Sequence, residues 1–220
     1  MNSKVKHGKK APSREAHPGE SRQRILDAAV KLFARHGYAG TGLRELATTA
    51  GVNLAMVNYF FGSKKGLLKE ILDDFFAGYL QIARDHLETE GDSNEKLDRF
   101  IRAAVYYFAE RRDFLVVVIT ELPHDDPEVI EHKASWGRQM MGIFNREICQ
   151  PLSRGRERPL SPLLIGPLLT SALASRFLFA PVSENLGAGS DGTVRFSVED
   201  YAEEMSRLLR CGLLDGTAAS

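Results

Sequence analysis

Apolar residues recur three and four positions apart along most of the chain, which is the spacing of one face of an α-helix. The first such stripe is Ile25, Ala28, Ala29, Leu32 and Phe33. Glycine, proline and polar clusters separate the stripes and mark their ends. The pattern predicts an all-α protein of about nine helices. We expect them over residues 22–36, 43–50, 54–60, 64–87, 97–111, 114–122, 128–149, 161–180 and 198–214.

One segment allows two interpretations. Residues 114–122 are apolar and rich in β-branched side chains, among them Val116, Val117, Val118 and Ile119. Such a short run is also compatible with a buried strand. Because the rest of the sequence offers no partner strand, we expect a buried helix.

Residues 41–62 have the pattern of two short helices joined by a tight turn. Gly51 ends the first, since glycine adopts a left-handed conformation without a Cβ clash. Asn53 can cap the second helix, Leu54–Phe60. Ala47 is small enough for the helices to cross closely. The segment predicts a helix-turn-helix.

The second of these helices keeps several side chains that the crossing does not use. These outward residues are Leu54, Ala55, Met56, Asn58 and Tyr59. Exposed Leu, Met and Tyr suit a helix that enters a DNA groove better than one that faces water. The alternative is an αα-hairpin inside an ordinary helical core.

Charge is divided unevenly along the chain, although the net charge is zero. Residues 1–65 hold 12 Lys/Arg and 4 Asp/Glu, hence +8, and the remainder carries −8. A basic N-terminal part on an acidic body fits phosphate binding at one end. Residues 1–20 form an apolar-poor basic tail that we expect to be disordered. It either follows DNA phosphates or only aids solubility.

Composition excludes several classes of protein. The hydrophobic content of 43% and the charged content of 26% are typical of soluble globular proteins. The sequence has no apolar run of 18 residues, and its basic N-terminus lacks the apolar segment of a secretory signal. The distant Cys149 and Cys211 suggest no disulfide framework. We therefore expect a cytoplasmic protein.

Catalytic and metal motifs are weak. His124, Asp125 and Asp126, with Glu128 and nearby Glu131 and His132, are better explained as a solvated loop and helix start than as a metal site. The sequence holds no Gly-rich phosphate loop, nucleophile elbow or credible triad. We expect no enzyme activity, no metal and no cofactor.

The ordered positions Ala47-x-x-Ala50-Gly51-Val52 and Val57-Asn-Tyr-Phe-Phe-Gly-Ser-Lys64-Lys-Gly-Leu67 resemble the DNA-binding domain of the TetR family of transcriptional regulators. The upstream stretch Ile25-Leu26-x-Ala28-Ala29-x-x-Leu32-Phe33-x-x-x-Gly37-Tyr38-x-x-Thr41 fits as well. The resemblance implies a three-helix DNA-binding head at 21–68, a larger helical ligand-binding and dimerisation body at 69–214, and tails at 1–20 and 215–220.

The resemblance also implies roles for individual residues. Arg44 would make a bidentate guanine contact, and Leu54, Ala55 and Met56 would touch thymine methyl groups. Phosphates would be held by Thr41, Asn58, Tyr59 and Lys64. The chain departs from the family pattern at Asn58, where an aromatic residue is frequent, and at Phe60, where histidine or tyrosine is frequent.

In the body, the resemblance implies a small-molecule pocket and a homodimer. The candidate pocket residues are Phe100, Tyr107, Phe114, Trp136, Met140, Phe144 and Phe177, although each is also a plausible core residue. The dimer would form through Ser161–Ala180 and Val198–Leu214. The expected function is a homodimeric repressor that a small apolar or aromatic ligand releases from a palindromic operator. The alternatives are a regulator whose body docks another protein, and an enzyme or scaffold with a fortuitous motif.

Overall fold

The computed structural model describes residues 18–123, 125–154, 156, 159–187 and 197–214. Across these residues the chain is helical and contains no strand, which confirms the all-α prediction. The segment at 114–122 is accordingly a helix. The elements are α1 (Pro18–Gly40), α2 (Leu43–Ala50), α3 (Leu54–Phe61), α4 (Lys64–Leu87), α5 (Ser93–Glu110), α6 (Arg112–Thr120), α7 (Pro127–Phe144), the π-helix η1 (Asn145–Cys149), α8 (Gln150–Ser153), α9 (Pro162–Leu178), α10 (Ala180–Gly187) and α11 (Val198–Leu214).

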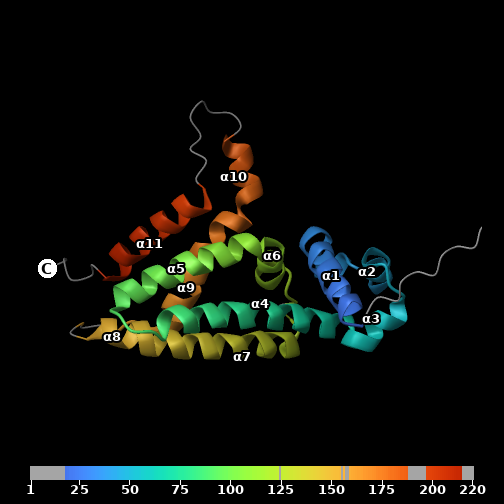
Figure 1. Ribbon diagram of the computed structural model, residues 1–220, viewed down its shortest axis with the longest axis horizontal. Helices are drawn as coiled ribbons and strands as arrows, with labels where there is room; N and C mark the ends of the chain where they lie inside the picture. Colours follow the sequence, from blue (N-terminus) through green and yellow to red (C-terminus); the bar gives the residue numbers. More distant parts are fainter. Residues whose placement is uncertain (1–17, 124, 155, 157–158, 188–196, 215–220) are drawn as a thin grey trace, which may run out of the picture.

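The three N-terminal helices form a small unit at one end of the molecule (Figure 1), which we call the head. Apolar residues of α1 form its centre, with Ile25, Ala29 and Phe33 fully buried. Leu46 of α2 and Val57 of α3 pack into the same core. Burial of these side chains is the main stabilising term for such short helices, which are marginal in isolation.

Helix α4 begins in the head and runs the length of the body, the part of the chain formed by α5–α11 (Figure 1). Ser63 caps α4 by accepting a hydrogen bond from the N–H of Gly66 at 3.0 Å. Helix α7 lies beside α4, and α5 packs against both α4 and α11. A single continuous helix therefore connects the head to the centre of the body.

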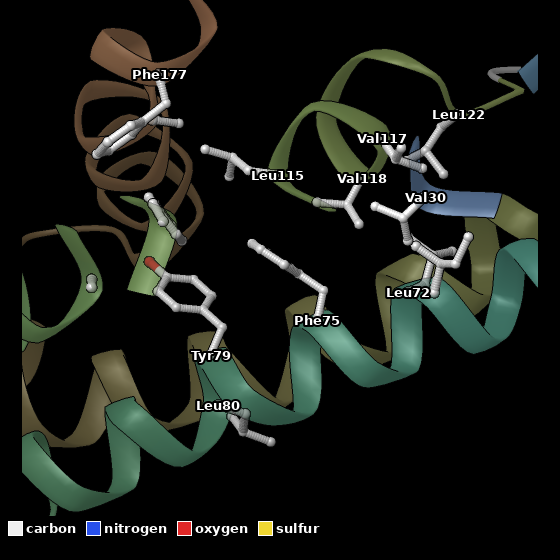
Figure 2. Packing of buried hydrophobic residues seen from close by; sticks show 14 of the residues in the cluster. Val30, Leu72, Phe75, Tyr79, Leu80, Leu115, Val117, Val118, Leu122 and Phe177 are labelled. Atoms are coloured by element: carbon white, nitrogen blue, oxygen red, sulfur yellow. The ribbon is translucent and has the colours of Figure 1, made fainter. Parts of the chain in front are cut away.

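The core of the body is formed by aromatic and branched side chains from α4, α5, α6 and α9. Figure 2 shows Phe75 and Tyr79 of α4 pointing to the side where Leu115 of α6 and Phe177 of α9 lie. The ring of Phe108 on α5 lies 5.1 Å from that of Tyr79, between centroids. Aromatic pairs at this separation add to the stability that burial provides.

Several helix boundaries differ from the predicted ones. Helix α1 begins at Pro18, so residues 18–20 are helical and not part of a tail. The predicted helix 128–149 corresponds to α7 and the π-helix η1, and α8 continues the helical geometry to Ser153. Helix α10 was not predicted, since no helix was expected between residues 180 and 198.

The remaining expectations about chain ends lie outside the described residues. These are the disordered tail over residues 1–17 and the tail at 215–220. The proposed division between head and body at residue 68 falls inside α4, which is continuous there. That division remains a proposal.

Candidate nucleic-acid interface

The turn between α2 and α3 determines which way α3 faces. Gly51 adopts the left-handed conformation, φ 65° and ψ 37°, that ends α2. The side chain of Asn53 then accepts a hydrogen bond from the N–H of Met56 at 2.9 Å and caps α3. Val57 and Phe61 face the core, which leaves the opposite side of α3 exposed to solvent.

Four of the eight predicted DNA-contact residues are exposed: Arg44, Ala55, Asn58 and Tyr59. Tyr59 has 83% of its surface exposed, although it is a large aromatic residue with only the neighbouring Phe60 ring beside it. Leu54, Met56 and Lys64 are partly exposed. The structure therefore exposes Arg44, Ala55, Asn58 and Tyr59 on the head. Leu54 and Met56, which were also predicted to face outward, pack partly against the core.

Thr41 differs from the other seven. It is only 2% exposed, and its hydroxyl donates a hydrogen bond to the carbonyl of Gly37 at 3.0 Å. Thr41 does not cap α2, because Gly42 holds the cap position and no side chain caps this helix. A phosphate oxygen can only accept a hydrogen bond, so a phosphate contact by Thr41 would require this hydroxyl to leave Gly37.

Lys64 lies at the corner between α1 and α2. Its ammonium nitrogen is 4.4 Å from the ring centroid of Tyr38 and donates to the carbonyl of Ala39 at 3.4 Å. Partial burial lowers the pKa of Lys64 from its usual value, since desolvation disfavours the charged form. One of its three donors is committed to Ala39, which leaves donors for the predicted phosphate contact.

Two arginines of α1 stabilise the helix-turn-helix through contacts that the sequence did not reveal. Arg24 donates to the carbonyl of Gly51 at 3.1 Å and so holds the α2–α3 turn. Arg22 pairs with Glu70 of α4, and its guanidinium lies 5.3 Å above the ring of Phe61. In the sequence, each of these arginines is only a basic residue on the polar face of a helix. Its partner can be identified only once the fold is known.

Thr48 and Thr49 of α2 are also exposed, and the sequence analysis did not single them out. The Thr48 hydroxyl donates to the carbonyl of Arg44 one turn earlier, at 2.9 Å. This local bond is a common side-chain contact within helices. It places Thr48 next to Arg44 on α2.

Comparisons with known proteins agree with this geometry. Residues 25–71 match the family described as "Bacterial regulatory proteins, tetR family". The chain is 30% identical over 127 residues to the probable HTH-type transcriptional regulator YttP of Bacillus subtilis, covering 56% of this chain and 61% of that protein. It is 28% identical over 116 residues to the HTH-type transcriptional repressor NicS of Pseudomonas putida, covering 53% of this chain and 55% of that protein.

The fold of the whole chain is found among solved structures. The transcriptional regulator FadR of Bacillus subtilis, in complex with stearoyl-CoA, superimposes with a TM-score of 0.68 at 16% identity. The superposition covers 88% of this chain and 98% of that one. Residues 25–71 therefore belong to the TetR family of regulatory proteins. The chain spans about three fifths or less of the length of the two curated relatives, which are transcriptional regulators and not enzymes.

The predicted pocket residues come from α5, α6, α7 and α9 of the body. Phe100 and Phe144 pack edge to face at 5.0 Å, and Phe177 packs against Tyr201 at 6.1 Å. The Tyr107 hydroxyl donates to the carbonyl of Phe75 at 2.7 Å. These side chains are engaged with the core, and their role in ligand binding stays a prediction.

The other predicted pocket residues are nearer the surface. Trp136 Nε1 donates to Asp73 at 2.7 Å, and Met140 is partly buried. Phe114 lies under the Arg111 guanidinium at 4.1 Å. It lines a surface groove of about 310 Å³ between α1 and the α5–α6 corner, with Asp27, Val30, Lys31, Glu110, Arg111, Arg112 and Asp113.

Acidic and histidine residues of the possible metal cluster at 124–132 form pairs with other side chains. Asp126 pairs with Lys65 at 2.6 Å, Glu128 pairs with Lys65 and Lys69, and His132 pairs with Asp73. His124 lies outside the described residues. Among those that are described, no group of three or more His, Cys, Asp or Glu side chains is placed to hold a metal ion.

The two helices predicted to form the dimer leave large apolar side chains exposed. Leu163, Leu164 and Leu168 of α9 are each more than half exposed, and Leu208 of α11 is half exposed. Phe179 and Val182 continue this apolar surface toward α10. In the described part of the chain, no helix is long and apolar enough to cross a membrane.

Proposed function

We propose that this TetR-family protein is a cytoplasmic, DNA-binding transcriptional regulator whose helix α3 enters the major groove. The observation that carries the proposal is the outward face of α3. Val57 and Phe61 fix the helix to the head, while Ala55, Asn58 and Tyr59 project away from it. A helix presented by a glycine turn in this way is the reading element of helix-turn-helix proteins.

The distribution of charge supports DNA as the partner. The first 65 residues carry +8 and the remainder −8. Electrostatic attraction to phosphates supplies most non-specific affinity for DNA, and an acidic body is repelled from the duplex. We therefore propose that the head alone contacts DNA, with Arg44 reading a base and Lys64 holding a phosphate.

We propose that the protein acts as a homodimer through α9 and α11 on a palindromic operator. Exposed Leu163, Leu164 and Leu168 form an apolar surface that a second copy would cover. An isologous two-fold dimer places the same helix twice, in opposite directions. Two heads would then read half-sites about one helical turn, roughly 34–36 Å, apart.

The finer proposal is a repressor that a small apolar ligand releases from DNA. Its support is the apolar, aromatic interior of the body between α4, α5 and α9. The relative NicS is a repressor, and the structural neighbour FadR was solved with stearoyl-CoA. Acyl-CoA thioesters are therefore the first ligand class to test.

One observation favours a regulator without a small-molecule effector, whose body docks another protein. Several of the seven predicted pocket residues are engaged by neighbouring rings or backbone groups. A second depression, of about 370 Å³, lies at the η1–α8 end and is lined by Asn145, Cys149, Gln150, Ser153, Arg154, Pro159 and Leu160. It contains none of those seven residues.

The test is selection of bound sites from random duplexes, followed by footprinting on the recovered sequence. We expect a palindrome protected over two half-sites, and loss of protection for Tyr59→Ala. Repeating the footprint with acyl-CoA esters of different chain length then tests the effector. Protection that no ligand alters would favour the protein-docking alternative, and failure to recover any palindrome would refute specific operator binding.

A further inference from the structure

The first half of α4 and the first half of α7 meet through polar side chains. Lys65, Lys69 and Asp73 are four residues apart and share one stripe of α4. Their partners on α7 are Glu128, His132 and Trp136, also four residues apart. The two helices run in the same direction, so the residues pair in order along the contact (Figure 1). We call this set the polar zipper.

The contacts in the polar zipper are specific. Glu128 accepts from Lys65 at 3.1 Å and pairs with Lys69. A carboxylate oxygen of Asp73 accepts from Trp136 Nε1 at 2.7 Å and lies 2.7 Å from His132 Nε2. Asp126, the cap of α7, adds a contact to Lys65 at 2.6 Å.

The contact changes character farther from the head. The α4 stripe continues through Phe76, Leu80, Ala83 and Leu87, which are apolar and, apart from the partly buried Phe76, fully packed in the core. Leu80 points to the opposite side of α4 from Phe75 and Tyr79 (Figure 2). The far part of α4 is therefore fixed by burial, whereas the part next to the head is fixed by exchangeable polar contacts.

A second polar contact joins the head to the body nearby. Gly37 interrupts α1 with φ 78°, which leaves the N–H of Tyr38 outside the helical hydrogen-bond pattern. Glu121, at the end of α6, accepts a hydrogen bond from this N–H at 3.2 Å. A Cβ at Gly37 would lie 2.9 Å from the same carboxylate oxygen, so a larger residue would disturb the contact.

The two contacts constrain the head from different directions. The polar zipper contacts the first three turns of α4, which directly follow the turn after α3. Glu121 accepts its hydrogen bond from the backbone at the corner between α1 and α2. Polar pairs at a partly exposed surface are weak individually and can exchange with water without exposing apolar area. They are suited to setting an angle while contributing little to overall stability.

We propose that Glu121 and Glu128 are positioning residues that set the orientation of the head on the body, and thereby the spacing of operator half-sites that the dimer accepts. Neither residue is among those that we propose to contact DNA. The inference rests on the proposed dimeric operator binding. It adds that base preference and spacing preference are controlled by different residues, Arg44 for the first and the two glutamates for the second.

The experiment measures affinity on a set of selected operators whose half-sites are moved together or apart by one or two base pairs. The variants are Glu121→Gln, Glu128→Gln and the double variant. The matched control is Glu88→Gln, which removes an interhelical partner of Arg146 at the far end of α4. Circular dichroism and the fluorescence of Trp136, the one tryptophan of the chain, monitor folding and the zipper separately.

We expect the wild type and Glu88→Gln to share one sharp spacing optimum. The double variant should shift that optimum or flatten it by about fivefold between adjacent spacings, because the contacts that orient the head are lost. Base preference within each half-site should not change. Removing a glutamate also leaves lysines free to bind DNA phosphates. That effect raises the affinity equally at all spacings, so it cancels in the ratio of affinities between two spacings.

Identical spacing profiles for the double variant and the wild type would overturn the proposal. An equal loss of affinity at every spacing would also overturn the proposal. Such a result would show a general defect in DNA binding and no change in the angle between head and body. If the wild type recovers no palindrome with any spacing, dimeric operator binding itself fails and this inference fails with it. The wild-type result therefore separates the two failures.

Discussion

The hydroxyl groups of Tyr79 and Thr170 lie 3.3 Å apart inside the body and join α4, which carries the head, to α9, which we propose as a dimer helix. Tyr79 is 3% exposed. Burial raises the pKa of its phenol to about 12, because a phenolate would lose its hydration there. The hydrogen bond between Tyr79 and Thr170 opposes this shift without cancelling it.

The raised pKa of Tyr79 predicts alkaline destabilisation. The unfolded phenol ionises near its ordinary pKa of about 10 while the folded one does not, so the stabilising contribution is complete below pH 10 and is lost as pH rises toward 12. The loss should reach about 2–3 kcal/mol of unfolding free energy. Urea unfolding at a series of pH values checks this. Tyr79→Phe should remove this pH dependence, and an unchanged alkaline slope in that variant would assign the effect to other groups.

The two sides of α3 should respond oppositely to truncation. Tyr59→Ala should change unfolding free energy by less than about 0.5 kcal/mol, because the side chain is exposed, yet it should weaken operator binding. Val57→Ala should cost about 1–3 kcal/mol of stability, because it opens a cavity beneath α3. Thermal unfolding and binding titrations on both variants make the comparison. A large stability loss for Tyr59→Ala would contradict the outward placement of α3.

Arg44 and Lys64 should differ in the kind of affinity they provide. Arg44→Ala should cost about 1–3 kcal/mol and relax preference at one base position. Lys64→Ala should weaken binding on all sequences alike and reduce the salt slope by about one unit. Binding to single-base operator variants at two salt concentrations distinguishes them. Equal behaviour of the two variants would refute the assigned roles.

The apolar surface of α9 should be needed for association. Leu168→Glu introduces a charge where we expect a second copy to pack, so the dimer should dissociate while the isolated chain stays folded. Sedimentation velocity gives the oligomeric state, and circular dichroism confirms helix content. The control is Glu203→Gln on α11, an exposed change that adds no charge to the apolar surface. A Leu168→Glu protein that sediments like the wild type would exclude α9 from the interface.

Acid should loosen the polar zipper before it unfolds the body. A hydrogen bond from Lys69, supported by one from Lys65, lowers the pKa of Glu128, and a hydrogen bond from Lys65 lowers the pKa of Asp126. Because these folded-state pKa values are depressed, the contacts are complete above the ordinary carboxyl pKa of about 4. They are lost as pH falls through the lower folded values. Trp136 fluorescence should follow this transition in the wild type.

The same titration of Glu128→Gln supplies the control. Its acid transition in Trp136 fluorescence should be smaller, since one of the titrating groups is absent. High salt should mimic acid in the wild type, because it screens partly exposed pairs. A fluorescence change that coincides with loss of helix content would show global unfolding and no separate zipper transition.

The local structure of the head could be predicted from the sequence because its determinants are local. A glycine that takes a left-handed conformation, a capping asparagine and apolar residues three and four apart act within one or two helical turns. These signals placed α2, α3 and the start of α4 within a residue of where they lie. The outward residues of α3 followed from the same periodicity, whereas the role of Arg44 was implied by the resemblance to the TetR family.

Contacts between distant segments were decided only by the tertiary structure. Thr41 was expected near a phosphate but is buried against Gly37, because the kink in α1 turns that carbonyl toward it. The acidic residues around Asp126 suggested a solvated loop, yet they pair with lysines 60 residues or so earlier. Sequence spacing within a helix shows which residues share a face of that helix. It does not show which face of another helix they will contact. That choice depends on how the whole core packs.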